Sequence, residues 1–333
     1  MNSENAQVLF FQHIKSMLPP QLALVDKIGE LLAISNDSAY RRIRGEKPIA
    51  FEELQKLCYY FKISLDQFLH LQNDSVIFSG QNVDSSLFDY DKYLAGVLQN
   101  LQMMNSFESK EMYYLNKDIP FFHHFHFPEL AAFKSFFWMK TVLHYPAFSN
   151  RQFRLDQCVT DNIIQTGRKI SEAYYSLPSQ EIWNIESINS TIRQIEYYRN
   201  SGVFAHSSDI VAIYDCLQKT IDHIEHQAES GYKFAINGSA GNKRSAYKIY
   251  INEFVLGDNT ILAVLGDTKI VYINHSVLNY IITRDQGFCE YMYQHIRNII
   301  TKSTLISEVG EKERRRFFNG IREKINSRKS ALL

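Results

Sequence analysis

Cysteine is scarce in this chain, and long uncharged apolar segments are missing. The four cysteines, at positions 58, 158, 216 and 289, lie far apart without a CxxC pair, which argues against a disulfide framework and favours reduced thiols. The most apolar stretch, residues 121–143, includes charged side chains and falls short of the roughly 18 uncharged residues that a membrane span needs. The first residues are polar and acidic, unlike a secretion signal. We therefore expect a cytoplasmic protein without a membrane partner.

Neither sign of charge is in excess. The chain has 36 basic and 36 acidic residues, so no overall positive field attracts nucleic acid, and any such attraction must come from local patches. Hydrophobic residues make up 45% of the sequence and charged residues 22%, which is typical of a globular protein and not of a disordered one. A length of 333 residues favours two or three domains over a single core.

The first 72 residues predict a compact module of five short helices. We expect these helices at residues 5–18, 22–32, 36–44, 51–61 and 65–71. Ser35 can cap the third helix, and Gly45 followed by Pro48 ends it. Within that helix Ala39 and Ile43 face the core. The remaining positions of the helix point outward, namely Asn36, Asp37, Tyr40, Arg41 and Arg44.

The second and third helices show the spacing of a helix-turn-helix. Gly29 offers a small residue where the two helices cross, and the turn at Ile34 leads directly to the capping Ser35. Residues 22–70 resemble a lambda-repressor-like, XRE-type helix-turn-helix domain. They depart from it at Ala33, where the family often has glycine, and at Arg42, where it often has an apolar core residue.

The resemblance implies a partner and a set of contacts. In this family the second helix of the motif enters the major groove of double-stranded DNA. By position, the residues that would read bases are Asn36, Asp37, Tyr40 and Arg41. Those that would contact phosphates are Ser35, Arg44 and Lys47. Residues 20–70 carry equal numbers of basic and acidic side chains, so only residues 41–47 are locally basic. The alternative is a plain helical bundle whose arginine-rich run is a solvated face.

Beyond a linker at residues 73–86, the pattern changes along the chain. Residues 87–229 are mostly helical, with segments expected at 90–104, 129–143, 155–175, 185–199 and 209–229. Residues 230–333 are expected to be α+β, with strands at 247–256, 260–265 and 269–275 and helices at 285–300 and 311–327. The predicted fold class is therefore α+β multidomain: an all-α helix-turn-helix bundle, a mostly helical region, and a small antiparallel β-meander flanked by helices. Residues 87–333 can also form one sensing and dimerisation domain.

Three further segments carry possible chemistry. Residues 121–127 hold three histidines; as an extended strand they place His124 and His126 on one face and His123 on the other, which favours an aromatic strand over a metal site. Residues 237–245 are glycine-rich and basic, and a hairpin loop is favoured over an anion site because phosphate-loop spacing is lacking. Residues 312–329 are strongly basic with an apolar stripe, typical of a helix that closes the core, although the basic face can also meet DNA or an acidic partner.

These observations favour a sequence-specific DNA-binding transcriptional regulator. We expect a homodimer that binds a palindromic operator, and a C-terminal region that dimerises and senses an unknown small-molecule or protein effector; sensing is inferred from the architecture alone. We predict no catalytic residues, no metal and no cofactor. Two alternatives stay open: a protein-interaction scaffold that uses the helical N-terminus, and an enzyme with an appended regulatory DNA-binding domain.

Overall fold

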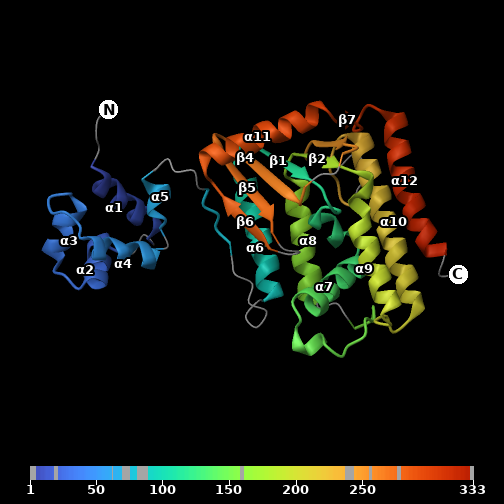
Figure 1. Cartoon of the computed structure of the whole chain (residues 1–333), viewed down its shortest axis with the longest axis horizontal. Coiled ribbons are helices and arrows are strands. Elements are labelled where there is room, and N and C mark those ends of the chain that lie inside the picture. Colours follow the sequence, from blue (N-terminus) through green and yellow to red (C-terminus); the bar gives the residue numbers. More distant parts are fainter. Residues whose placement is uncertain are drawn as a thin grey trace. The chain divides into compact units, whose positions relative to one another are not determined.

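The chain forms two compact units, residues 1–77 and residues 78–333. The structure, a computed structural model, describes residues 5–18, 22–61, 63–69, 76–80, 89–157, 161–236, 244–254, 257–275 and 279–330. Residues 237–243 of the predicted glycine-rich loop at 237–245, and most of the predicted linker, lie outside the described residues. Figure 1 shows the elements of each unit.

Unit 1 is the helical bundle that the sequence predicts. Its helices are α1 (Ala6–Met17), α2 (Leu24–Leu32), α3 (Asn36–Ile43), α4 (Phe51–Phe61) and α5 (Leu65–Phe68). The apolar positions spaced three and four apart on these helices meet in one small core. The buried members of this core are Phe10, Phe11, Ile14, Ile28, Leu32, Ala39, Leu57 and Phe61.

Unit 2 is built on one mixed sheet. In the described residues its strands are β1 (Lys110–Leu115), β2 (Ser179–Trp183), β3 (Tyr247–Ile251), β4 (Thr260–Leu265), β5 (Thr268–Asn274), β6 (Tyr280–Thr283) and β7 (Thr304–Leu305). Their order across the sheet is β6-β5-β4-β1-β2-β3-β7. Strands β1, β2 and β3 are parallel, whereas β4, β5 and β6 form an antiparallel meander. The sequence predicted the meander one strand earlier, from residues 247–256, 260–265 and 269–275. The first of these strands, β3, pairs instead with β2 and β7, and β5 pairs with β6. At one edge Ser79 forms an isolated bridge with Ile282 of β6. The α+β class is confirmed.

Four strands of the described residues were not expected from the sequence: β1, β2, β6 and β7. Strands β1 and β2 lie within the region that was predicted to be mostly helical, and they separate β3 from β4. All five residues of β2 are buried, so the strand shows no alternation of polar and apolar residues that would reveal it. Its neighbours β1 and β3 are both parallel to it, and such pairing brings together segments that are distant in the sequence.

Helices cover both faces of the sheet (Figure 1). On one face α11 (Gln286–Thr301) packs against β4 and β5. The main core lies on the other face, where the helices are α6 (Tyr90–Asn105), α7 (Pro128–Phe137), α8 (Asp161–Tyr175), α9 (Asn189–Asn200), α10 (Ser207–Ser230) and α12 (Glu311–Ser330). Short turns complete this layer: η1 (Phe121–His126), η2 (Trp138–Val142), η3 (Pro146–Phe148) and η4 (Ile185–Ile188). Among the described residues, no helix has both the length and the apolar character that crossing a membrane requires.

The predicted basic helix near the C-terminus packs against the core as expected. Helix α12 buries the apolar stripe Phe317, Phe318, Ile321 and Ile325 and lies along α10. Much of its positive charge is neutralised within unit 2. Arg322 binds Asp222, with a distance of 2.7 Å between Nε and Oδ1, and also Glu225. These ion pairs argue against the alternative that the whole basic face is free for DNA.

Candidate nucleic-acid interface

The turn between α2 and α3 is closed by tight backbone packing. Ala33 ends α2 in the left-handed conformation, with φ 54° and ψ 47°, and the Ile34 amide donates to the Gly29 carbonyl at 3.0 Å. A Cβ atom on Gly29 would lie 3.1 Å from Oδ1 of Asn36 and 3.2 Å from the Ile34 carbonyl oxygen. Position 29 therefore needs a very small residue for α3 to cross α2, as the sequence predicts.

Helix α3 begins and ends where its sequence indicates. The Ser35 hydroxyl accepts a hydrogen bond from the Ser38 amide at 3.3 Å, and Gly45 follows the helix with φ 74°. Ala39 is fully buried, and Ile43 packs against the core of unit 1. All seven residues that the sequence predicts as DNA contacts are exposed: Ser35, Asn36, Asp37, Tyr40, Arg41, Arg44 and Lys47.

Some of the exposed side chains of α3 are held by contacts with neighbouring side chains. Asp37, Tyr40, Arg41 and Arg44 are spaced three and four apart and so share one face of the helix. The guanidinium of Arg44 lies over the Tyr40 ring, 5.5 Å from its centroid. The side chain of Arg41 makes no hydrogen bond or ion pair with the described residues, whereas its backbone carbonyl accepts from the amides of Glu46 and Lys47. Asn36 differs from the others, because its amide donates to Oδ1 of Asp26 on α2 at 2.9 Å.

Arg42 has a role that the sequence does not reveal. Its side chain is buried and forms a two-bond pair with Glu53 of α4, with distances of 2.8 Å from Nε to Oε2 and 2.7 Å from Nη2 to Oε1. Glu53 also accepts from the Ala50 amide at 3.0 Å, at the start of α4. The hydrogen bond from Arg42 lowers the pKa of Glu53. Arg42 and Glu53 thus form an ion pair that joins α3 to α4.

Gln7 of α1 fixes the backbone that follows α3. Its amide nitrogen donates to the carbonyls of Arg42, at 2.7 Å, and of Lys47, at 2.8 Å. Its amide oxygen accepts from the Ile49 amide at 3.0 Å. One side chain from the first helix therefore satisfies three backbone groups around the basic segment. The contacts span 35 to 42 residues, so no local pattern could predict them.

We expect Ala33→Gly to stabilise unit 1. A non-glycine residue in the left-handed region costs about 1–2 kcal/mol, whereas the freedom that glycine adds to the unfolded chain costs about 0.4–1 kcal/mol. The difference is a gain of about 0.5–1 kcal/mol in the free energy of unfolding, measured by urea denaturation. Ala95→Gly, at an exposed position within α6, should instead destabilise that helix. A loss of stability in Ala33→Gly would contradict this account of the turn.

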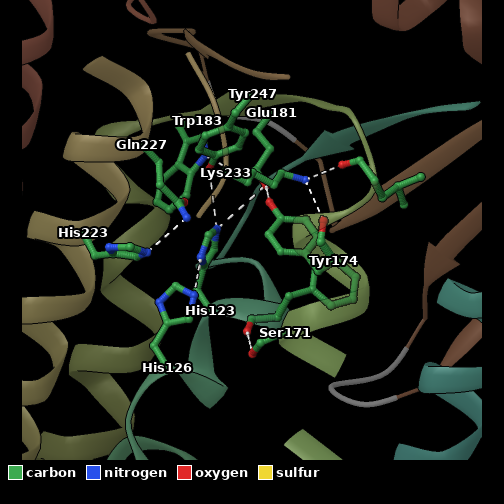
Figure 2. A network of polar contacts seen from close by, with 12 residues as sticks. His123, His126, Ser171, Tyr174, Glu181, Trp183, His223, Gln227, Lys233 and Tyr247 are labelled. Carbon is green, nitrogen blue, oxygen red and sulfur yellow. Dashed lines mark hydrogen bonds and ion pairs between the residues drawn. The ribbon is translucent and has the colours of Figure 1, made fainter. Parts of the chain in front are cut away.

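Unit 2 contains a buried polar cluster, shown in Figure 2. At its centre the carboxylate of Glu181 on β2 accepts hydrogen bonds from Trp183 Nε1 and the Tyr247 hydroxyl, both at 2.8 Å, and from the Tyr174 hydroxyl. Lys233 is fully buried beside it and donates to the carbonyls of Tyr174 and Leu177. Burial lowers the pKa of Lys233 against the opposing effect of Glu181. These groups satisfy one another within the core.

The histidines of residues 121–127 do not form a strand, so that prediction was wrong. Pro120 fixes the backbone before a 3-10 helix, in which side chains three apart lie on the same side. His123 Nδ1 is consequently 3.4 Å from His126 Nε2, and His223 of α10 faces His126. Burial lowers the pKa of His223 to about 4. In the described part of the chain no group of three or more His, Cys, Asp or Glu side chains has metal-binding geometry.

The crossing of α3 over α2, with a closed turn and an exposed face on α3, defines a helix-turn-helix domain. Residues 21–90 match the family model of the BetR domain, a helix-turn-helix DNA-binding domain family. The match begins before α2 and extends past α5 to the first residue of α6. No curated protein and no solved structure matches the chain. The match indicates a DNA-binding regulator.

Proposed function

We propose that unit 1 binds DNA in the XRE manner, with α3 in the major groove. The exposed face of α3 carries the proposal, because its side chains are held on a rigid frame but are not used by the fold. The Arg41 side chain makes no hydrogen bond or ion pair with a described residue and can donate two hydrogen bonds to guanine. The side-chain nitrogen of Asn36 donates to Asp26, which leaves its Oδ1 atom to accept a hydrogen bond from a base. The chain would then act as a sequence-specific transcriptional regulator in the cytoplasm.

We further propose that the protein binds as a homodimer and responds to an effector. Unit 1 has few positive charges, and three of its cations form ion pairs within the unit: Arg42 with Glu53, Lys27 with Glu30 and, at the surface, Arg44 with Glu46. A single unit would make few phosphate contacts, whereas a two-fold dimer doubles them and reads a palindrome. Unit 2 is much larger than unit 1, which favours it as the site of both pairing and effector binding. An effector would act by favouring one dimer geometry over another.

The test is selection of bound sequences from random DNA by the full chain, at low salt. An enriched palindrome supports both DNA reading and pairing. An enriched single half-site would overturn the dimer, and no enrichment would overturn the whole proposal.

Arg41→Ala should then weaken binding to the selected site by about 5- to 150-fold per half-site, because a two-bond contact to a base contributes about 1–3 kcal/mol of discrimination. The same variant should also relax the base preference at one position of the site. Lys56→Ala removes an exposed charge from α4 in the same unit and is the control, expected to leave the preference unchanged. Fluorescence anisotropy with labelled duplexes measures both. Unchanged affinity in Arg41→Ala would point to a protein partner for α3.

A further inference from the structure

A cavity of about 590 Å³ lies in unit 2 between α6 and the sheet. Its floor is a row of side chains that cross four strands at one level: Tyr114 of β1 is paired with Ile261 of β4, Ile261 with Tyr272 of β5, and Tyr272 with Ile282 of β6. Its roof is one face of α6, where Tyr93, Gly96, Val97, Asn100, Leu101 and Met104 recur at helical spacing. The volume is within the range of about 300–1,000 Å³ found for sites of drug-sized ligands.

Gly96 keeps the cavity open at the cost of helix stability. It lies in the middle of α6, where glycine costs about 1 kcal/mol relative to alanine. Its backbone does not need glycine, because φ is not in the left-handed region. An added Cβ would meet no atom within 4 Å, so close packing does not require glycine either. The missing side chain leaves space on the face of α6 that lines the cavity.

The tyrosine hydroxyls of the floor have hydrogen atoms that they do not donate to any described residue. The Tyr272 side chain is 6% exposed, and its hydroxyl has no hydrogen-bond partner among the described residues. The hydroxyls of Tyr114 and Tyr280 are 3.2 Å apart, so one hydrogen of that pair remains to be donated. A buried hydroxyl without a partner is unfavourable, and an acceptor on a bound molecule would satisfy it. Burial raises the pKa of Tyr272 to about 12, so this hydroxyl stays protonated.

The charged residues around the cavity are at the start of α6. Lys92 and Asp89 are 3.5 Å apart and neutralise each other in exposed positions. The other described lining residues are uncharged and mainly apolar, including Leu101, Met104 and Met112. An ion in this cavity would lose its hydration without gaining a counter-charge. The chemistry therefore selects a neutral molecule with a large apolar surface and a hydrogen-bond acceptor.

We propose that this cavity is the effector site of unit 2, and that it binds a neutral, largely apolar small molecule whose acceptor group meets the Tyr272, Tyr114 and Tyr280 hydroxyls. The regulatory role of the ligand as an effector rests on the proposed function. Binding of the ligand to this cavity does not, because it does not depend on DNA. The cavity also includes Ser79 and Gly80, near the start of unit 2. A ligand there would contact the segment that follows the DNA-binding unit in the chain.

The experiment uses Nile red, a neutral dye with a carbonyl acceptor and no donor, titrated into the full chain. We expect saturable binding of one dye per chain, seen as a blue shift and a rise in emission. Gly96→Leu places a side chain in the cavity and should weaken binding at least tenfold. Ala95→Leu adds the same side chain to the exposed face of α6 and should leave binding unchanged. Tyr272→Phe removes one donor and should weaken binding about 2- to 12-fold, as one neutral hydrogen bond predicts.

Stability separates loss of the site from loss of the fold. Gly96→Leu should unfold at the same temperature as the wild type or higher, because leucine has the better helix propensity. Equal dye affinity in Gly96→Leu and in the wild type would overturn the site, as would the absence of saturable binding in the wild type. These outcomes are independent of DNA selection. A chain that selects a palindrome but does not bind the dye loses only this inference, and one that binds the dye but selects no DNA loses only the DNA-binding proposal.

Discussion

Replacing Glu53 with alanine should strongly destabilise unit 1 and thereby weaken DNA binding. The change leaves the Arg42 guanidinium buried without its counter-charge, which costs about 3–5 kcal/mol. A unit of this size has a free energy of unfolding of about 4–12 kcal/mol, so the loss is a large share of its stability. Calorimetry of the full chain should show the transition of unit 1 moving to much lower temperature while that of unit 2 stays in place.

A matched variant tests whether burial is the cause. Glu46→Ala removes a carboxylate that pairs with Arg44 at the surface, 3.8 Å away, and should change the stability by less than about 1 kcal/mol. The double change of Arg42→Met with Glu53→Leu should restore most of the stability, because it removes both charges together. If Glu53→Ala were as stable as Glu46→Ala, the ion pair would not hold α3 to α4.

The same pair makes unit 1 sensitive to acid. The pKa of Glu53 is lowered in the folded state, so the stabilisation is fully present above the unfolded value of about 4.3 and is lost as the pH falls through the folded value. The wild type should therefore lose part of the stability of unit 1 below about pH 4. Glu53→Gln should lack that part of the dependence.

Replacing Glu181 with alanine should have a comparable or larger effect on unit 2. The change removes the acceptor of three buried donors, on Tyr174, Trp183 and Tyr247, and leaves Lys233 without a neighbouring negative charge. Each buried donor without a partner costs about 1–3 kcal/mol, so we expect a loss of about 5 kcal/mol or more. Near-ultraviolet circular dichroism, which reports the packing of the aromatic rings, follows the unfolding in urea.

The control is a glutamate within α8. Glu172→Ala removes an exposed carboxylate that pairs with Arg244, and it should have little effect. Glu181→Gln should be almost as damaging as Glu181→Ala, because its amide group would place donors against donors. If Glu181→Gln were as stable as the wild type, the shape of the side chain would matter at this position and its hydrogen-bond acceptors would not.

Local signals in the sequence predict the helix-turn-helix well. Ser35, Gly29 and Gly45 each act on atoms within about ten residues, and they define the cap, the crossing and the end of α3. The outward direction of Tyr40 and Arg41 follows from helical spacing alone. What the sequence missed in unit 1 depends on partners far along the chain. Arg42 looks like another surface arginine until α4 brings Glu53 to it, and Gln7 gives no sign of its three contacts.

The strand order of unit 2 was harder to predict, because strands that are distant in the sequence pair with each other. Strand β2 pairs with β1, about 67 residues earlier, and with β3, about 68 residues later, so no turn between them marks the pairing. Its buried glutamate contradicts the usual pattern of a core strand and is explained only by donors from α8 and β3. The cavity between α6 and the sheet is non-local as well, because Gly96 and Tyr272 line it from segments that are distant in the sequence.

The edge strands of the sheet affect the tendency of the protein to aggregate at high concentration. Open strand edges invite pairing with other chains, and natural proteins cover or shorten them. Here β7 offers only two residues at one edge, and at the other Ser79 exchanges two hydrogen bonds of 2.7 Å with Ile282 of β6. Loss of the Ser79 bridge would expose β6, whose residues Tyr280, Ile281 and Ile282 are strongly β-forming. The segment that leads into unit 2 thereby also protects the chain against edge-to-edge aggregation.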